Sequence, residues 1–322
     1  MTHRDKPRYE IKYKLTAKTP IFSHRLEAWA QKADGILFIP GSSLKGAARN
    51  QYKQRSSPIE TGIIESTERL LFGDMTSASN MLFSDALCTS HQEIELHTSV
   101  AINRSAKSLG QVVAREAIPA GTEFVGKVIF TEKPNGVERC VALSAILDIP
   151  RWGPYATRGF GQWSVSILER SSVAVFISYS WEHDEQHKKW VRDLALRLID
   201  TGVDVLLDQF VPMFDKQTPQ KEINEWMIQC VNNSDKVIAV LTPTYRHKAE
   251  NGLGGVGFEY NRLCAENGKF SEKLTRYVGI LRKGDRSTSL PKYLDNRPVF
   301  YMYNSQACDE EFPLLIRAIT LS

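Results

Sequence analysis

From residue 173 onward, short apolar runs alternate with longer amphipathic segments, and this alternation constrains the fold more than any other feature of the sequence. The first run, Val173–Ile177, is continuously apolar, which is typical of a strand buried on both faces of a parallel sheet. The segment after it carries apolar residues at helical spacing and ends at Gly202. The alternation predicts an open, mostly parallel α/β sheet with ligands at the carboxyl ends of its strands. Further strands are predicted at 203–208, 236–242 and 277–282, and helices at 219–234 and 257–268.

The first half of the chain follows a different pattern. Polar and apolar residues alternate at 8–22, 122–132 and 161–169, as they do in antiparallel strands that have one solvated face. A short basic helix is predicted at 44–55. This mixture favours an α+β domain with an antiparallel sheet.

Length and composition agree with two soluble domains. The chain has 322 residues, of which 42% are hydrophobic and 24% are charged. The small polar pair Ser171 and Ser172 precedes the first parallel strand, so we predict domains at 1–171 and 172–322. The charged N-terminus lacks the apolar core of a signal peptide, and no run of about 18 apolar residues could span a bilayer. We therefore predict a cytoplasmic protein without a membrane partner.

Cysteine and histidine patterns do not indicate a metal site. The five cysteines are scattered without a C-x-x-C pair, which speaks against a disulfide framework and against a cysteine zinc site. His183 and His187 stand four residues apart, but Glu185 is misplaced for an H-E-x-x-H motif and no third ligand is evident. We predict no metal site, and a solvated helix face for the two histidines.

Charge is shared unequally between the two halves. Residues 1–171 hold 22 Lys and Arg against 17 Asp and Glu, a net of +5, whereas the remaining residues hold 19 against 20, a net of −1. The first half is therefore the candidate for an acidic partner such as a nucleic acid.

The stretch "GLGGVG" at 252–257 spells the G-x-G-x-x-G fingerprint of dinucleotide-binding folds. In a Rossmann unit the first glycine follows the strand directly, and an acidic residue ends the next strand. Here nine residues separate Thr242 from Gly252, and the strand at 277–282 does not end in a carboxylate. The context speaks against a Rossmann cofactor site. A surface loop that caps a helix remains an alternative interpretation of the stretch.

Residues 175–210, "VFISYSWEHDEQHKKWVRDLALRLIDTGVDVLLDQF", and residues 237–263, "VIAVLTPTYRHKAENGLGGVGFEYNRL", resemble the bacterial branch of the TIR/SEFIR family. The likeness spans 173–320 and implies a flavodoxin-like α/β fold. It also implies an NAD glycohydrolase (NADase), an enzyme that cleaves NAD between nicotinamide and ribose with one glutamate. Glu259, in "GGVGFE", occupies the position of that glutamate.

A single carboxylate suits this chemistry, because cleavage of an N-glycosidic bond develops positive oxocarbenium character on the ribose. Taken alone, Glu259 is better explained as a carboxylate favoured by the dipole at the N-terminus of its helix, and only the family motif favours the catalytic role. In this interpretation NAD is a substrate and no cofactor is implied. For Tyr179 and Asp208, a packed aromatic ring and a loop cap are the structural alternatives. By the resemblance, the NAD-binding candidates are Ser178, Tyr179, Ser180, Asp208, Gly255 and Gly257.

Five segments of the first half resemble the RAMP superfamily, and most closely the backbone subunits of type III CRISPR effector complexes. They are "LFIPGSSLKGAARNQY", "LLFGD", "MLFSDA", "VAINRSAKSLGQVVAREAIPAGTEFVGKVIF" and "TRGFGQ", in family order. The likeness covers residues 9–169 and implies a ferredoxin-like, RRM-type core that polymerises along guide RNA. Its thumb hairpin separates guide from target.

Several residues of these segments are candidates for binding RNA. "PGSSLKG" places hydroxyls and backbone amides at a helix N-terminus, which is a natural phosphate site. A capped helix, a tight turn and a solvated basic hairpin are the ordinary alternatives. Asp34 resembles a hairpin-turn residue rather than a catalytic aspartate, and Asn103 stands where many relatives carry Asp, so we predict binding without cutting. The RNA-binding candidates are Ser42, Ser43, Lys45, Arg49, Arg104, Lys107 and Arg158.

Together the two resemblances imply an antiviral, CRISPR-like effector. Binding of guide RNA and a complementary target would line up chains into a multimer or filament, and TIR domains brought together would destroy NAD. Other CRISPR-like subunits are further candidate partners. Two alternatives stay open: a non-catalytic TIR/SEFIR adaptor on an RNA-binding scaffold, and a RAMP ribonuclease with a structural TIR domain.

Overall fold

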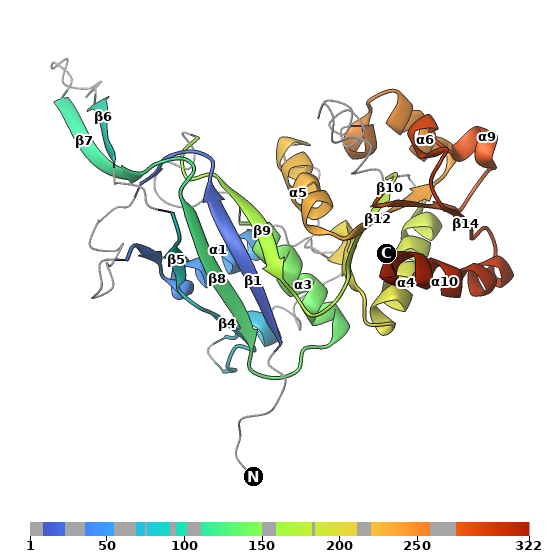
Figure 1. The fold of residues 1–322 in the computed structure, drawn as a ribbon, viewed down its shortest axis with the longest axis horizontal. Coiled ribbons are helices and arrows are strands. Elements are labelled where there is room, and N and C mark those ends of the chain that lie inside the picture. Colours follow the sequence, from blue (N-terminus) through green and yellow to red (C-terminus); the bar gives the residue numbers. More distant parts are fainter. Residues whose placement is uncertain are drawn as a thin grey trace, which may run out of the picture. The chain divides into compact units, whose positions relative to one another are not determined.

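The computed structural model divides the chain into two compact units, which are described separately (Figure 1). The first unit contains 1–51, 68–133 and 145–170, and the second contains 52–67, 134–144 and 171–322. The predicted domain limits at 171 and 172 remain a prediction. The structure describes residues 9–22, 36–54, 69–74, 76–90, 95–101, 111–149, 159–181, 184–210, 220–257 and 275–321.

The first unit is built on an antiparallel sheet in the order β3-β5-β8-β1-β9, with β4 paired to β8. Alternate residues of β1 and β8 are buried, as the polar and apolar alternation predicts. Phe124 and Trp163 meet edge to face in the core, with ring centroids 5.8 Å apart. The elements are β1 (Glu10–Ala17), β3 (Phe38–Ile39), α1 (Gly41–Gln54), β4 (Met81–Phe83), β5 (Ala86–Cys88), β8 (Glu123–Phe130) and β9 (Trp163–Glu169).

A two-stranded ribbon of β6 (Glu95–Ala101) and β7 (Gln111–Ile118) extends beyond this sheet (Figure 1). At its base, β7 also pairs with β2 (Ile21–Phe22). The ribbon lies within the segment that resembles the thumb hairpin of the RAMP superfamily. The predicted α+β class of the first half is confirmed.

The second unit contains a five-stranded sheet in the order β11-β10-β12-β13-β14, and all four neighbouring pairs are parallel. This order, with the first strand between the second and the third, is that of flavodoxin-like folds. All six residues of β10 are buried, as its continuous apolar run predicts. The flavodoxin-like class is confirmed. The strands are β10 (Ala174–Tyr179), β11 (Asp204–Leu206), β12 (Lys236–Leu241), β13 (Tyr277–Leu281) and β14 (Val299–Tyr301).

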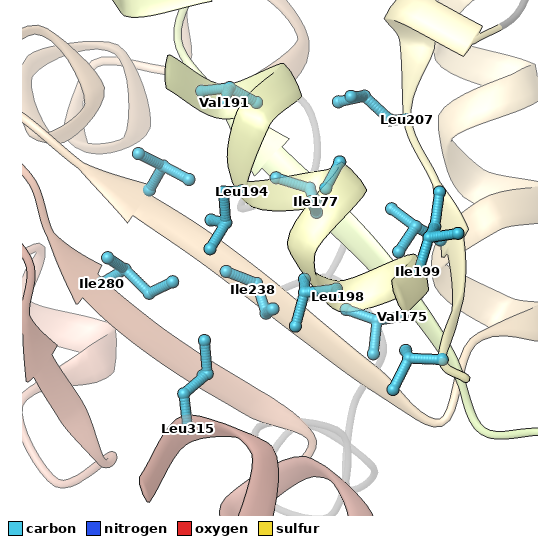
Figure 2. Close-up of a cluster of buried hydrophobic side chains, with 14 of the residues drawn as sticks. Val175, Ile177, Val191, Leu194, Leu198, Ile199, Leu207, Ile238, Ile280 and Leu315 are labelled. Atoms are coloured by element: carbon cyan, nitrogen blue, oxygen red, sulfur yellow. The ribbon is translucent and has the colours of Figure 1, made fainter. Parts of the chain in front are cut away.

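Helices α4 and α10 contribute apolar side chains to a core on this sheet (Figure 2). Val191, Leu194 and Leu198 of α4 belong to one buried cluster with Val175 of β10 and Leu315 of α10. Such a cluster is the main source of stability for helices on a sheet. The helices are α4 (Glu185–Asp200), α5 (Gln220–Asn233), α6 (Pro243–Glu250), α9 (Arg286–Ser289) and α10 (Ser305–Thr320).

His187 lies on the buried face of α4, so the prediction of a solvated face is wrong for this residue. Its ring contacts Tyr179, with centroids 5.9 Å apart. The sequence suggested solvent because histidine is polar, but the position three residues after the N-cap Asp184 faces the sheet. His183 lies outside the described residues.

Helix α6 also differs from the sequence analysis, which treated 243–251 as a connection to the glycine stretch. Pro243 is the first helical residue, and the Thr242 hydroxyl caps the helix by accepting from the Tyr245 amide at 3.1 Å. Tyr245 and Ala249 are its buried residues. Two buried side chains are too few to give a helical pattern that can be recognised in sequence.

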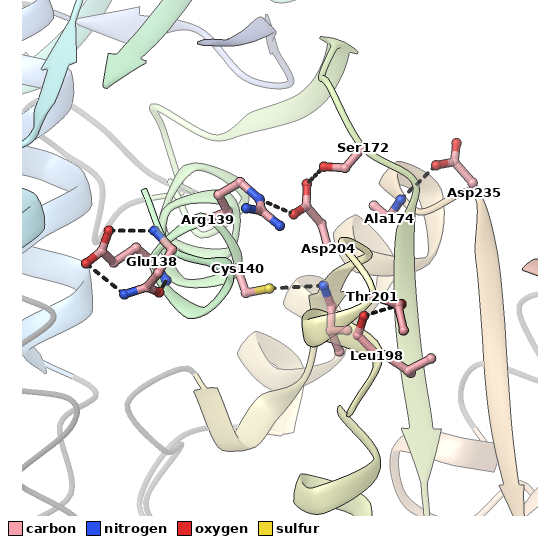
Figure 3. Close-up of polar contacts among 11 residues, drawn as sticks. Glu138, Arg139, Cys140, Ser172, Ala174, Leu198, Thr201, Asp204 and Asp235 are labelled. Atoms are coloured by element: carbon pink, nitrogen blue, oxygen red, sulfur yellow. Dashed lines mark hydrogen bonds and ion pairs between the residues drawn. The ribbon is translucent and has the colours of Figure 1, made fainter. Parts of the chain in front are cut away.

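Residues 134–144, the start of α3 (Gly136–Leu147), belong to the second unit by their contacts (Figure 3). Arg139 Nε donates to Asp204 Oδ1 at 2.8 Å, and Ser172 Oγ donates to the other Asp204 oxygen. Cys140 Sγ accepts from the Val205 amide at 3.1 Å, and burial raises the pKa of this thiol to about 12. These contacts join α3 to the edge strand β11.

The described residues contain no helix long and apolar enough to cross a membrane. In the same part of the chain, no group of three or more His, Cys, Asp and Glu side chains is placed to hold a metal ion.

Candidate functional site

A cavity of about 140 Å³ lies at the carboxyl end of β10 in the second unit. This is where ligands bind in open parallel α/β sheets. One wall comes from β10 and from Trp181, two residues past its end, and another comes from α5. The remaining wall residues include Asp208, Lys248 of α6 and the glycine segment 254–256. Apolar walls with a few charged groups are typical of sites for small organic ligands.

Asp208 is the centre of a hydrogen-bond network in this wall. Its Oδ2 accepts from the Tyr179 hydroxyl at 3.0 Å and from Trp181 Nε1 at 2.7 Å. Gln209 Nε2 donates to the Tyr179 hydroxyl at 3.2 Å and to the Lys188 carbonyl at 3.1 Å. The network fixes both aromatic rings relative to the carboxylate.

Burial raises the pKa of Asp208 to about 6, although the donors Tyr179 and Trp181 stabilise the ionised form. Its second oxygen, Oδ1, is buried and has no hydrogen-bond partner among the described residues. Burial, and next the negative charge of Asp208, raise the pKa of the Tyr179 hydroxyl. The site therefore combines a poorly solvated acid with a phenol that stays protonated.

The predicted NAD-binding residues separate into two groups. Ser178, Tyr179, Asp208 and Gly255 line the cavity. Ser180 does not, among the residues described: it is fully buried and its Oγ lies 3.3 Å from Thr242 Oγ1. Ser178 Oγ lies 3.3 Å from the Tyr245 hydroxyl.

The glycine stretch packs tightly within the protein. A Cβ on Gly255 would lie 2.7 Å from Met227 Sδ, and a Cβ on Gly257 would lie 2.2 Å from the Gly252 carbonyl carbon. Gly252 and Gly254 have φ of 67° and 61°, which favours glycine. Gly257 is absent from the described cavity wall, and it packs closely against Gly252. Glu259 lies outside the described residues.

Sequence reasoning missed three prominent wall residues: Trp181, Trp226 and Lys248. Trp181 directly follows "SYS" at the carboxyl end of a strand, which is a signal that could have found it. The other two lie on α5 and α6, and only the fold brings them to the cavity.

Four of the predicted RNA-binding residues lie on α1. Ser42 is exposed in its first turn, and Ser43, Lys45 and Arg49 are half-buried. Burial, and next the charge of Arg49, lower the pKa of Lys45, so the two cations lie close together. Arg104, Lys107 and Arg158, and also Asp34 and Asn103, lie outside the described residues.

One amide at the start of α1 already has an anionic partner. Gly41 N donates to Asp85 Oδ1 at 3.0 Å. A Cβ on Gly41 would lie 2.1 Å from the Phe83 carbonyl oxygen, so this close approach requires glycine. Asp85 therefore neutralises part of the positive field that the helix N-terminus would offer a phosphate.

Comparisons with protein families match the two halves of the chain to two different families. Residues 14–166 match the RAMP superfamily, and residues 175–302 match the TIR domain. Both predicted resemblances are confirmed. No curated protein matches the chain.

Solved structures similar to parts of the chain include a type III-B Cmr-beta complex bound to cognate target RNA, at 17% identity and a TM-score of 0.39. That match covers 51% of this chain and 60% of the other, less than two thirds of its length. A prokaryotic SEFIR domain matches at 28% identity and a TM-score of 0.37, over 46% of this chain and 99% of its own. A type IV-B CRISPR complex matches at 16% identity and a TM-score of 0.39, over 51% of this chain and 93% of its own.

Proposed function

Because this chain joins a region of the RAMP superfamily to a TIR domain, we propose that it is a CRISPR-like antiviral effector whose TIR domain cleaves NAD at the nicotinamide–ribose bond. Glu259 is the catalytic carboxylate in this proposal. Binding of guide and target RNA by the RAMP region assembles several chains and activates the enzyme.

The observation that carries the proposal is the cavity at the carboxyl end of β10. Its wall holds Tyr179, Asp208 and Gly255, which the family resemblance assigns to NAD. Gly255 precedes Glu259 by only four residues in the sequence, within the motif that the family resemblance assigns to NAD cleavage. Glu259 then stabilises the positive charge that develops on the ribose as the bond breaks.

The RNA half of the proposal rests on α1. Lys45 and Arg49 stand one turn apart, and the charge of Arg49 contributes to lowering the pKa of Lys45. The two cations form a basic spot on the helix that also carries the exposed Ser42. Paired cations of this kind bind phosphates without reading base sequence. A backbone subunit that repeats along RNA needs such contacts.

The adaptor alternative has one observation in its favour. Packing against Met227 and Gly252 is a sufficient reason for Gly255 and Gly257, so the glycine stretch does not require a ligand. An adaptor would use the same fold to recruit other TIR domains and would leave NAD intact.

Measuring nicotinamide release from NAD tests the proposal directly. The purified full-length assembly, with its bound nucleic acid, is expected to release nicotinamide, and Glu259→Gln is expected to abolish release. Glu250→Gln is the matched control, because Glu250 pairs with Arg246 on α6 and does not line the described cavity. Equal rates for wild type and Glu259→Gln would assign the chemistry elsewhere. No release by the wild type would favour the adaptor.

A further inference from the structure

Trp181 is the most exposed of the tryptophans that the structure describes, at 44%. Trp163 and Trp226, in contrast, are 2% and 3% exposed. Water contact is unfavourable for a large aromatic ring, and an exposed ring beside a cavity often marks a binding surface. Trp181 lines the cavity described above, so the exposed ring is at a candidate ligand site.

Trp181 is held in place by both its side chain and its backbone. Its Nε1 donates to Asp208 Oδ2 at 2.7 Å, and its carbonyl oxygen accepts from Lys248 Nζ at 2.7 Å. Charge-assisted hydrogen bonds of this length are strong. The indole therefore presents a fixed surface, which lowers the entropic cost of stacking a ligand on it.

The charges around the indole favour one kind of ring. The face of an indole attracts cations, and the carboxylate of Asp208 at its N–H adds negative charge nearby. Lys248 lies in the same wall and supplies a positive charge suited to a phosphate. A ligand that matches both the indole face and the charge of Lys248 has a planar cationic ring that a short linker joins to an anionic phosphate.

We propose that Trp181 is the stacking surface for the nicotinamide ring of NAD, with Asp208 fixing the indole, and with Lys248 holding the Trp181 backbone and facing the adjacent phosphate. This inference rests on the proposed function and names the part of NAD that the cavity accepts. The pyridinium ring is the cation, and the nicotinamide mononucleotide half carries the phosphate. The adenine ring is neutral and gains less from this surface.

The expected kinetic effect of Trp181 is on binding. Cleavage converts the cationic pyridinium into neutral nicotinamide, so attraction between indole and cation is strongest in the bound substrate and weakens toward the transition state. An interaction that is stronger in the bound substrate than in the transition state lowers KM but does not raise kcat. Removing it is therefore expected to raise KM without lowering kcat.

Equilibrium binding to the full-length Glu259→Gln assembly tests the proposal without turnover. The probes are nicotinamide mononucleotide and ADP-ribose, with binding measured by calorimetry. Trp181→Ala is expected to weaken nicotinamide mononucleotide binding about tenfold, as loss of a stacking partner does, and to change ADP-ribose binding less than twofold. Trp181→Phe keeps an aromatic ring but lacks the N–H donor. Its affinity for nicotinamide mononucleotide is therefore expected to lie between that of the protein with Trp181 and that of Trp181→Ala.

Tyr303→Ala is the matched control, because Tyr303 is 57% exposed in the same unit and does not line this cavity among the described residues. It is expected to leave both probes unaffected. Circular dichroism and the thermal midpoint show whether each variant folds, and Trp181→Phe retains the test if Trp181→Ala does not.

The outcomes separate this proposal from the NADase proposal. NAD turnover with an unchanged KM in Trp181→Ala, together with unchanged nicotinamide mononucleotide binding, overturns the stacking role and leaves the NADase intact. Loss of ADP-ribose binding alone overturns it as well, because Trp181 would then hold the adenosine half. Trp181-dependent binding of nicotinamide mononucleotide without NAD cleavage by the wild type supports the stacking role and contradicts the NADase.

Discussion

Asp208 gives a prediction that concerns stability. Its pKa is raised from 3.8 to about 6, so its contribution to stability is fully present below pH 3.8 and is lost as pH rises through 6. The shift of about two units sets an upper limit of roughly 3 kcal/mol on the destabilisation at neutral pH. Asp208→Asn, which cannot ionise, is expected to be about 1–2 kcal/mol more stable than wild type at pH 8, because the lost charged hydrogen bonds offset part of the gain.

Denaturant unfolding of both proteins between pH 4 and pH 8 measures this difference. The difference in unfolding free energy between the two proteins is expected to disappear toward pH 4, where wild-type Asp208 is protonated. Burial raises the pKa of Asp208, and the positive charge of Lys188 on α4 lowers it. The pKa of Asp208 is therefore sensitive to charge on α4. A gap that stays constant across the range would show that Asp208 titrates with its ordinary pKa.

Two glycines of one stretch are predicted to differ in their tolerance of alanine. The Cβ of Gly257→Ala would meet the Gly252 backbone, which cannot yield, so we expect a loss of about 2 kcal/mol in unfolding free energy. The Cβ of Gly255→Ala would meet the flexible end of Met227, which can move, so we expect a smaller loss together with a narrower cavity. Thermal unfolding of the two variants compares them, and equal losses would contradict the packing described here.

At the scale of elements, sequence patterns predicted four of the five strands of the parallel sheet, but not β14 or the helices α3, α6 and α10. Strand β10 can be recognised from its continuous apolar run, because a strand buried on both faces needs apolar residues throughout. Helix α4 can be recognised from the spacing of Val191, Leu194 and Leu198, because burial of one helix face requires apolar residues at that spacing. Helix α6 depends instead on the Thr242 cap and on tertiary burial of Tyr245, which local periodicity does not record.

The candidate site was predictable only in part, for a related physical reason. Tyr179 and Asp208 each end a segment with a strand pattern, so the carboxyl-end rule finds them. Trp226 and Lys248 reach the cavity from helices far along the chain, and their placement follows from helix packing on the sheet. His187 was misjudged because a polar residue type outweighed its position on the helix.

The attachment of α3 to β11 is predicted to depend on one ion pair. Arg139 and Asp204 side chains are 16% and 8% exposed, and removing one partner leaves a buried charge. Arg139→Leu is expected to cost about 3 kcal/mol in denaturant unfolding. Lys189→Leu is the control, since its pair with Asp193 is 66% and 50% exposed, and surface pairs contribute below about 1 kcal/mol. Equal costs would mean that Ser172 alone satisfies Asp204.

At the scale of the whole molecule, the proposal requires RNA to control the enzyme through assembly. Alignment of TIR domains along one scaffold raises their local concentration to about the millimolar range, which favours weak contacts. A fragment of residues 172–322 is expected to be nearly inactive at low concentration. That fragment also lacks 134–144, which belong to the second unit, so its inactivity alone would not identify the cause.

The sharper test keeps the chain whole. Lys45→Glu with Arg49→Glu is expected to weaken RNA binding and to abolish NAD turnover, although Glu259 is untouched. Wild-type binding is expected to fall steeply with salt, because phosphate contacts release counterions, and the variant is expected to show a shallower dependence. Lys18→Glu with Lys133→Glu changes the net charge equally at two exposed positions and is expected to retain turnover. NAD turnover that is unchanged by the α1 reversal, while RNA binding is lost, would show that the RAMP region does not control the enzyme.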